Sequence, residues 1–236
     1  MKIRYLRSAF VLCALTSMLL IQGAIALQAQ VSQPDPAYTS PVDSVLARFE
    51  RESRAVAVNN IGLVWIIRVF HDPSPSVARR DSLLDGLERL ARVSNSSYVR
   101  QSAASTVALA GDLHLPRTTP GVVARLARIY AANDEQGPVR LSIRRRMTIQ
   151  AERRAAAAFL RSVAIQEDPS VDRQAHPMSD PRIDALSQLT EMGEEGRAVL
   201  QEMHRRGEVR SPQVRAKLEY MARSGFPVRD ARRPQP

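Results

Sequence analysis

Apolar residues recur at intervals of three and four along most of this 236-residue chain, and this period constrains the fold more than any other feature. The clearest stretches are residues 78–93, 121–131, 183–192 and 214–222. In the first stretch the apolar positions are Leu83, Leu84, Leu87, Leu90 and Ala91. This spacing is typical of a helix that buries one face, whereas a strand would alternate apolar and polar residues. The sequence therefore predicts an all-α fold.

One segment is apolar all round rather than on one side. Residues 61–70 read IGLVWIIRVF, a run that fits a buried strand or a fully buried helix equally well. Because Val45, Leu46 and Phe49 precede it with a helical period, we predict a central helix in the core. The alternative is a patch around Trp65 that binds a partner, since large exposed apolar patches mark interaction sites.

The N-terminus has the organisation of a secretory signal. Three basic residues, Lys2, Arg4 and Arg7, precede an apolar run over 9–26 that ends in Ala24-Ile25-Ala26. Small residues in this pattern favour cleavage, so residues 1–26 are predicted to be a signal peptide and the protein to be periplasmic or secreted. The alternative is an uncleaved membrane anchor, because the run is about long enough to span a bilayer.

Composition sets the remaining boundaries. Residues 27–41 are rich in Gln, Ser and Pro, which predicts a disordered linker, and residues 227–236 contain arginines between prolines, which predicts a disordered tail. The predicted domain, residues 42–226, contains no cysteine, because Cys13 is the only one in the chain. A domain of this length can bury enough surface to fold without disulfides.

Four predicted helices begin with related residues. They are Tyr98-Val99-Arg100, Pro138-Val139-Arg140, Pro181-Arg182-Ile183 and Gln213-Val214-Arg215. The β-branched residues at 99, 139, 183 and 214 are 40, 44 and 31 positions apart, which suits one helical hairpin each. A hairpin buries only one face, so neighbouring hairpins must cover the other. The repeat predicts an α-α superhelix, a short solenoid of stacked helical hairpins.

The best copy of this repeat resembles the HEAT-repeat superfamily. In that family the second helix opens with Pro or a polar residue and then Val-Arg, and an aspartate stands five residues before the valine. Residues 134–140 match this pattern fully, with Asp134 and Arg140 at the two polar positions. The resemblance covers about residues 77–226. It implies that Asp134 and Arg140 join a hydrogen-bonding ladder between repeats, and that the protein is a binding scaffold.

The other copies depart from the pattern. Ser94, Met178 and Val209 occupy the aspartate position, and Asp184 stands where the third copy would place its arginine.

The strongest charge feature lies within residues 140–161, where seven arginines accompany one acid, Glu152. The candidate partner-binding residues are Arg140, Arg144, Arg145, Arg154 and Arg161. One interpretation is that their stems pack over alanine-rich helices with the charged heads in water. The other is a face for an anionic partner, such as an acidic protein segment, a phosphate polymer or lipid headgroups. We expect the helix to break near Gln150.

No motif for catalysis or for metal or cofactor binding is present. The four histidines are His71, His114, His176 and His204, and no two have the spacing of metal ligands. The helical spacing of His204 and Glu208 predicts a solvated charge pair. There is no nucleophile elbow or phosphate-binding loop, which leaves an enzyme with an unrecognised site as a remote alternative.

The predicted function is an exported, non-enzymatic helical-repeat scaffold or adaptor that binds another macromolecule. Downstream of residue 26 there are 31 basic and 24 acidic residues, a net charge of +7. We therefore expect a protein partner with an acidic surface, and no cofactor or small-molecule substrate. Nucleic acid is not expected, because exported proteins rarely meet DNA and because a basic excess made almost entirely of arginine fits a GC-rich genome better than selection for a nucleic-acid surface. Membrane contact is expected only if the N-terminal segment is not cleaved.

Overall fold

The computed structural model describes residues 36–55, 64–72, 74–115, 117–133, 137–166 and 180–226. The chain divides into two units, residues 1–40 and residues 41–236. The described part of the first unit contains the short helix α2 (Pro36–Thr39), which lies within the predicted linker. The predicted signal peptide and the predicted C-terminal tail lie outside the described residues.

The second unit is built from helices. They are α3 (Val42–Ala55), α4 (Val64–His71), α5 (Val77–Val93), α6 (Ser97–Ala110), α7 (Val122–Ala131), α8 (Pro138–Arg146), the 3₁₀ helix η1 (Met147–Ile149), α9 (Arg153–Ile165), α11 (Pro181–Thr190), α12 (Glu194–Arg206) and α13 (Pro212–Arg223). No strand occurs in the described segments, where extended pairing is limited to isolated bridges such as the one between Asp112 and Gln150. The prediction of an all-α fold is confirmed.

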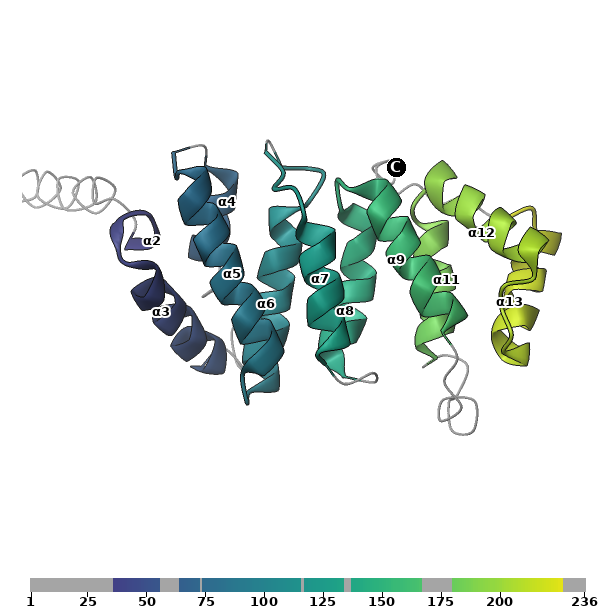
Figure 1. Ribbon diagram of the computed structural model, residues 1–236, viewed down its shortest axis with the longest axis horizontal. Coiled ribbons are helices and arrows are strands. Elements are labelled where there is room, and N and C mark those ends of the chain that lie inside the picture. The colour runs from purple at the N-terminus through teal and green to yellow at the C-terminus, as the bar shows by residue number, and fades with distance from the viewer. Residues whose placement is uncertain are drawn as a thin grey trace, which may run out of the picture. The chain divides into compact units, whose positions relative to one another are not determined.

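Helices of the second unit contact one another in two rows (Figure 1). The first row contains the first helix of each hairpin, in the order α3, α5, α7, α9 and α12, and each of these packs against the next. The second row contains α4, α6, α8, α11 and α13, and each of these also packs against the next. From α5 onward, the two helices of each hairpin pack against one another.

The core lies between the two rows and is filled by the predicted apolar stripes. On α5, for example, Leu83, Leu84 and Leu87 are fully buried. Of the four β-branched residues that mark the repeat, Val99, Val139 and Val214 are buried, whereas Ile183 is half-buried. The register of the third copy therefore differs from the other three.

The apolar segment 61–70 is helical and buried where it is described. Ile66, Val69 and Phe70 of α4 have almost no exposed surface, so the prediction of a core helix is confirmed for these residues. Residues 61–63 lie outside the described part of the chain. Trp65 is half-buried and donates a hydrogen bond to Glu52 of α3 at 2.7 Å, which links the two helices of the first hairpin.

Two glycines allow the chain to turn or pack where a side chain would interfere. Gly207 ends α12 in the left-handed region with φ 61°, a conformation that glycine adopts without steric cost. A Cβ added to Gly196 of α12 would lie 1.8 Å from the carbonyl oxygen of Leu189 in α11. The α11–α12 junction therefore brings a helix directly against a backbone carbonyl.

Candidate partner-binding surface

Arginines near the start of the second-row helices turn back onto the preceding turn. Arg100 Nη1 donates to the Ser94 carbonyl oxygen at 2.6 Å, and Arg215 Nε donates to the Val209 carbonyl oxygen at 3.1 Å. Ser94 and Val209 are the residues that occupy the aspartate position of the sequence motif. Both arginines therefore bind the backbone carbonyl oxygen of the residue at that position.

Arg140 makes a related contact. Its Nε donates to the Tyr130 carbonyl oxygen at 2.7 Å, and its guanidinium lies 4.5 Å from the centre of the Tyr130 ring. The predicted partner Asp134 lies outside the described residues, so its part in the ladder stays a prediction.

A connection between hairpins is formed by Asn133, a residue that the sequence analysis did not select. Its Oδ1 accepts from Arg100 Nε at 3.0 Å, and its Nδ2 donates to the Ala91 carbonyl oxygen at 2.9 Å. Asn133 follows α7, whereas Arg100 and Ala91 belong to the preceding hairpin. The only feature of the sequence that could have indicated this role is that Asn133 directly precedes Asp134 of the repeat motif.

In the α9–α11 hairpin, the arginine of the repeat is Arg182 rather than the residue after Ile183. Arg182 is almost fully buried and forms an ion pair at 2.8 Å with Asp180, the N-cap residue of α11. Asp184, which the sequence alignment placed at the arginine position, instead accepts from Arg144 Nε of α8 at 2.6 Å.

The arginine-rich stretch is divided between the two rows. Helix α8 ends at Arg146 and α9 begins at Arg153, so the helix breaks close to Gln150 as expected. Arg140, Arg144 and Arg145 therefore belong to the second row, and Arg154 and Arg161 belong to the first.

Three of the five candidate arginines have partners within the chain. Arg144 is only 4% exposed and also donates to the Tyr130 hydroxyl at 3.3 Å. Arg161 donates from Nε to a Glu208 carboxylate oxygen at 2.9 Å and from Nη2 to the other oxygen. Arg140 is bound to Tyr130 as described above.

The remaining two, Arg145 and Arg154, are exposed and have no side-chain partner among the described residues. Partner binding by the whole set stays a prediction.

Glu152, the one acid of this stretch, binds the start of α7. Its two carboxylate oxygens accept from the amides of Gly121 at 2.8 Å and Val123 at 3.0 Å. A carboxylate at a helix N-terminus satisfies free amides and complements the positive end of the helix dipole. Glu152 therefore stabilises the N-terminus of α7 and does not serve as the ion-pair partner of a neighbouring arginine.

The first row has a concentrated ionic cluster at the α5–α7 junction. The buried Glu88 of α5 accepts from Arg128 Nε at 2.7 Å and from Arg125 Nη1 at 3.0 Å. The hydrogen bond from Arg128 lowers the pKa of the Glu88 carboxyl below its ordinary value, against the opposing effect of burial. Asp85 also binds Arg125 at 2.5 Å, from an exposed position.

The solvent side of the second row has a different character. On α6, α8 and α11 it consists mainly of half-buried hydroxyl, amide and aliphatic side chains. We call this the second-row surface, and it comprises Gln101, Ser102, Ser105, Leu109, Leu141, Ser142, Arg145, Ile183 and Ser187. The hydroxyls of Ser105 and Ser142 lie 3.1 Å apart and join α6 to α8.

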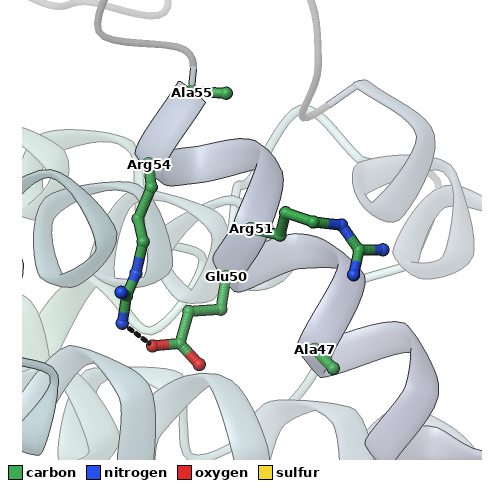
Figure 2. Close-up of a pocket in the computed structure, with 5 residues that line it drawn as sticks. All are labelled: Ala47, Glu50, Arg51, Arg54 and Ala55. Atoms are coloured by element: carbon green, nitrogen blue, oxygen red, sulfur yellow. Dashed lines mark hydrogen bonds and ion pairs between the residues drawn. The ribbon is translucent and has the colours of Figure 1, made fainter.

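An open pocket lies along α3, at the start of the second unit. Its described lining residues are Ala47, Glu50, Arg51, Arg54 and Ala55. Figure 2 shows that Glu50 and Arg54 form an ion pair, at 2.6 Å, while Arg51 points away from them. These exposed and half-buried side chains provide no convergent set of polar groups of the kind that fixes a small ligand.

The acidic residues and histidines of the described segments do not assemble into a metal-binding cluster. No group of three His, Cys, Asp or Glu side chains there could hold a metal ion. The predicted pair of His204 and Glu208 is wrong, because Glu208 pairs with Arg161 from α9. The His204 ring instead packs edge-on against Phe226, with centroids 6.0 Å apart.

Within the described segments no helix is both long enough and apolar enough to cross a membrane. Comparisons of the chain with protein-family models, with curated proteins and with solved structures find no match.

Proposed function

We propose that residues 42–226 form a short solenoid of stacked helical hairpins, similar to HEAT repeats, and that this solenoid is a non-enzymatic scaffold for another macromolecule. The observation that carries the proposal is the contact pattern, in which each row continues from one hairpin to the next. Solenoids are built from such nearest-neighbour contacts, and they present extended surfaces for binding. Arginines near the start of α6, α8 and α13 add support, because each donates to a backbone carbonyl oxygen earlier in its own hairpin and the contact thus recurs in three hairpins.

The second-row surface is the proposed partner-binding surface. Among the described residues its side chains form few interactions, such as the Ser105–Ser142 contact, whereas the first-row surface between α5 and α7 is occupied by the Glu88 ion pairs. Half-buried hydroxyl and aliphatic groups suit a protein partner, which needs apolar contact together with hydrogen bonds. Arg145 is the candidate arginine that projects from this surface without a partner among the described residues, and it would bind an acidic side chain.

The proposed setting is outside the cytoplasm, with residues 1–26 removed. Mass spectrometry of the N-terminus, after separation of soluble and membrane fractions of the producing cells, tests this setting. A soluble product that begins near Leu27 is expected. A membrane-bound product that begins at Met1 would contradict cleavage and favour the tethered alternative.

Site-specific photocrosslinking tests the binding surface. A photoreactive residue at Ser142, on the second-row surface, is expected to form a discrete adduct in the producing cells, and Arg145→Glu should weaken that adduct. The matched control is the same residue at Ala124, an exposed position on α7 of the first row. Equal adducts at both positions, or an adduct unaffected by Arg145→Glu, would contradict the proposed surface.

A further inference from the structure

The second-row helices of the first three hairpins, α4, α6 and α8, contain no acidic residue. They contain the arginines Arg68, Arg100, Arg140, Arg144, Arg145 and Arg146. The first-row helices α3 and α5 differ, because each of them contains three acidic residues. The solvent side of this part of the second row therefore has a positive charge that its own helices do not neutralise.

Two of these arginines, Arg68 of α4 and Arg145 of α8, are exposed, and neither guanidinium has a partner among the described residues. The side chains of Arg100, Arg140 and Arg144 instead donate to acceptors inside the protein. An exposed guanidinium on a surface without acids is available to an anionic group of a partner.

Arg68 and Arg145 face solvent on the same side of the row. Ile66 and Ile143 are buried, and each precedes one of these arginines by two residues. Helix residues two apart point about 160° away from one another, so both arginines point away from the core. Each lies in the last turn of its helix. Helices of one row run in the same direction, because the chain reverses twice between them (Figure 1), so the arginines lie toward the same end of the row.

Helix α6 lies between α4 and α8 and packs against both. Packed helices are about 8 to 10 Å apart, so the axes of α4 and α8 are separated by about 20 Å. Half-buried serines occupy the surface between the arginines. We call Arg68, Ser102, Ser105, Ser142 and Arg145 the two-arginine strip. Its length corresponds to about six residues of an extended chain.

The acids that adjoin α4 and α8 bind other groups. Asp72, which follows α4, accepts from the amide and hydroxyl of Ser74 at 2.8 and 2.6 Å. Asp184 of α11 accepts from Arg144 at 2.6 Å, and Glu152 binds the amides at the start of α7. The positive charge of the strip is therefore left for a partner.

We propose that the two-arginine strip binds an extended acidic segment of the protein partner, with one carboxylate at Arg68 and another at Arg145. The strip overlaps the second-row surface, so its role rests on the function proposed above. Serine hydroxyls can donate to and accept from the backbone of such a segment. Half-buried Leu109 and Leu141 on the same surface suit the apolar side chains of a peptide, which a phosphate polymer lacks.

Two peptides test the strip in the full protein, with binding measured by fluorescence anisotropy. The first has aspartates at its ends and about five serines and leucines between them, and the second contains the same residues with the aspartates adjacent. The first is expected to bind more tightly, because only its aspartates can reach both arginines. Arg68→Glu and Arg145→Glu should each weaken its binding about tenfold. Arg89→Glu, the same charge change at an exposed position of α5, should leave it unchanged.

Both variants of the strip should keep the native unfolding midpoint, because neither arginine has an internal partner among the described residues. Equal binding of the two peptides, or no saturable binding of either, would overturn the proposal. Tighter binding of inorganic polyphosphate than of the first peptide would also overturn it, in favour of a phosphate polymer.

The photocrosslink at Ser142 separates this result from the function proposed above. If Arg145→Glu weakens the adduct and Arg68→Glu does not, the second-row surface stands and the two-arginine strip is rejected. The absence of a discrete adduct would reject both.

Discussion

The α5–α7 and α6–α8 junctions join the same two hairpins but use different interactions. Between α5 and α7, one buried carboxylate, Glu88, binds two arginines of the next helix. Between α6 and α8, the polar contact is a hydroxyl pair, Ser105 and Ser142, beside an α6 that is largely alanine at its buried positions. One junction is specified by charge and the other by close packing.

The difference shows that one row of helices can fix the register of the stacked hairpins while the other row leaves its surface free for binding. Ion pairs of Glu88 require particular residues about 40 positions apart, so they fix which helix faces which. Small uncharged groups let α6 and α8 approach closely and leave their solvent side free of strong internal interactions. That division makes the second row the better candidate for binding a partner.

The largest expected effect comes from Glu88→Ala, which removes the shared carboxylate of the charged junction. We expect a loss of about 3 kcal/mol in the free energy of unfolding, because Arg128 loses its carboxylate and Arg125, which is largely buried, keeps only the exposed Asp85 as a partner. Denaturant unfolding measures this loss. Glu219→Ala is the matched control, since Glu219 is exposed on α13 and should change stability by less than about 0.5 kcal/mol. Equal losses would remove the distinction between the two junctions.

Next in size is Ala108→Leu at the close-packed junction. Ala108 is fully buried, and its carbonyl oxygen accepts from Gln150 Nε2 at 3.0 Å. Three additional carbons at this position should cost about 2 kcal/mol by overpacking, measured by denaturant unfolding. The exposed Ala124→Leu on α7 is the control, and a neutral result for Ala108→Leu would show that α6 and α8 can separate freely.

The pH dependence of the charged junction should be of intermediate size. The folded state lowers the pKa of Glu88 from its ordinary value of 4.5, so its contribution is present above that pH and is lost as the pH falls through the folded-state pKa. The stability difference between the native protein and Glu88→Ala should therefore shrink in acid. A difference that is constant with pH would mean that the stabilisation comes from packing alone, because other carboxylates cancel between the two proteins.

The smallest expected effect is the loss of the hydroxyl pair. Ser105→Ala and Ser142→Ala should each cost about 0.5 to 1 kcal/mol, and the double variant should cost little more than either single one. A double-mutant cycle of unfolding free energies measures this coupling. Fully additive losses would show that the two hydroxyls are stabilised by solvent rather than by each other.

Much of the secondary structure could be predicted from the sequence. The stripe of Leu83, Leu84 and Leu87 is both visible in the sequence and buried in the structure, because helical period and burial are directly connected. The arginines that donate to backbone carbonyl oxygens, such as Arg100 and Arg215, could be partly predicted from the Val-Arg repeat. Their acceptors could not be predicted, because a backbone carbonyl leaves no signature in the sequence.

The candidate site was harder to predict, for a related reason. The arginines of residues 140–161 are close in sequence, but the break between α8 and α9 places them in different rows. Glu208 was assigned to His204 by local spacing, yet its partner is Arg161, 47 positions away. Local spacing determines contacts only within one helix.

By itself, the sequence determined that the chain forms amphipathic helices with buried apolar faces, since the period of three and four residues is a local property. The tertiary structure alone decided which charges are used inside the protein and which remain available. Arg144 and Arg161 have carboxylate partners, while Arg68 and Arg145 have none among the described residues. The reason is physical: the partner of a charged side chain is set by the packing of one hairpin on the next, across about 40 residues of sequence.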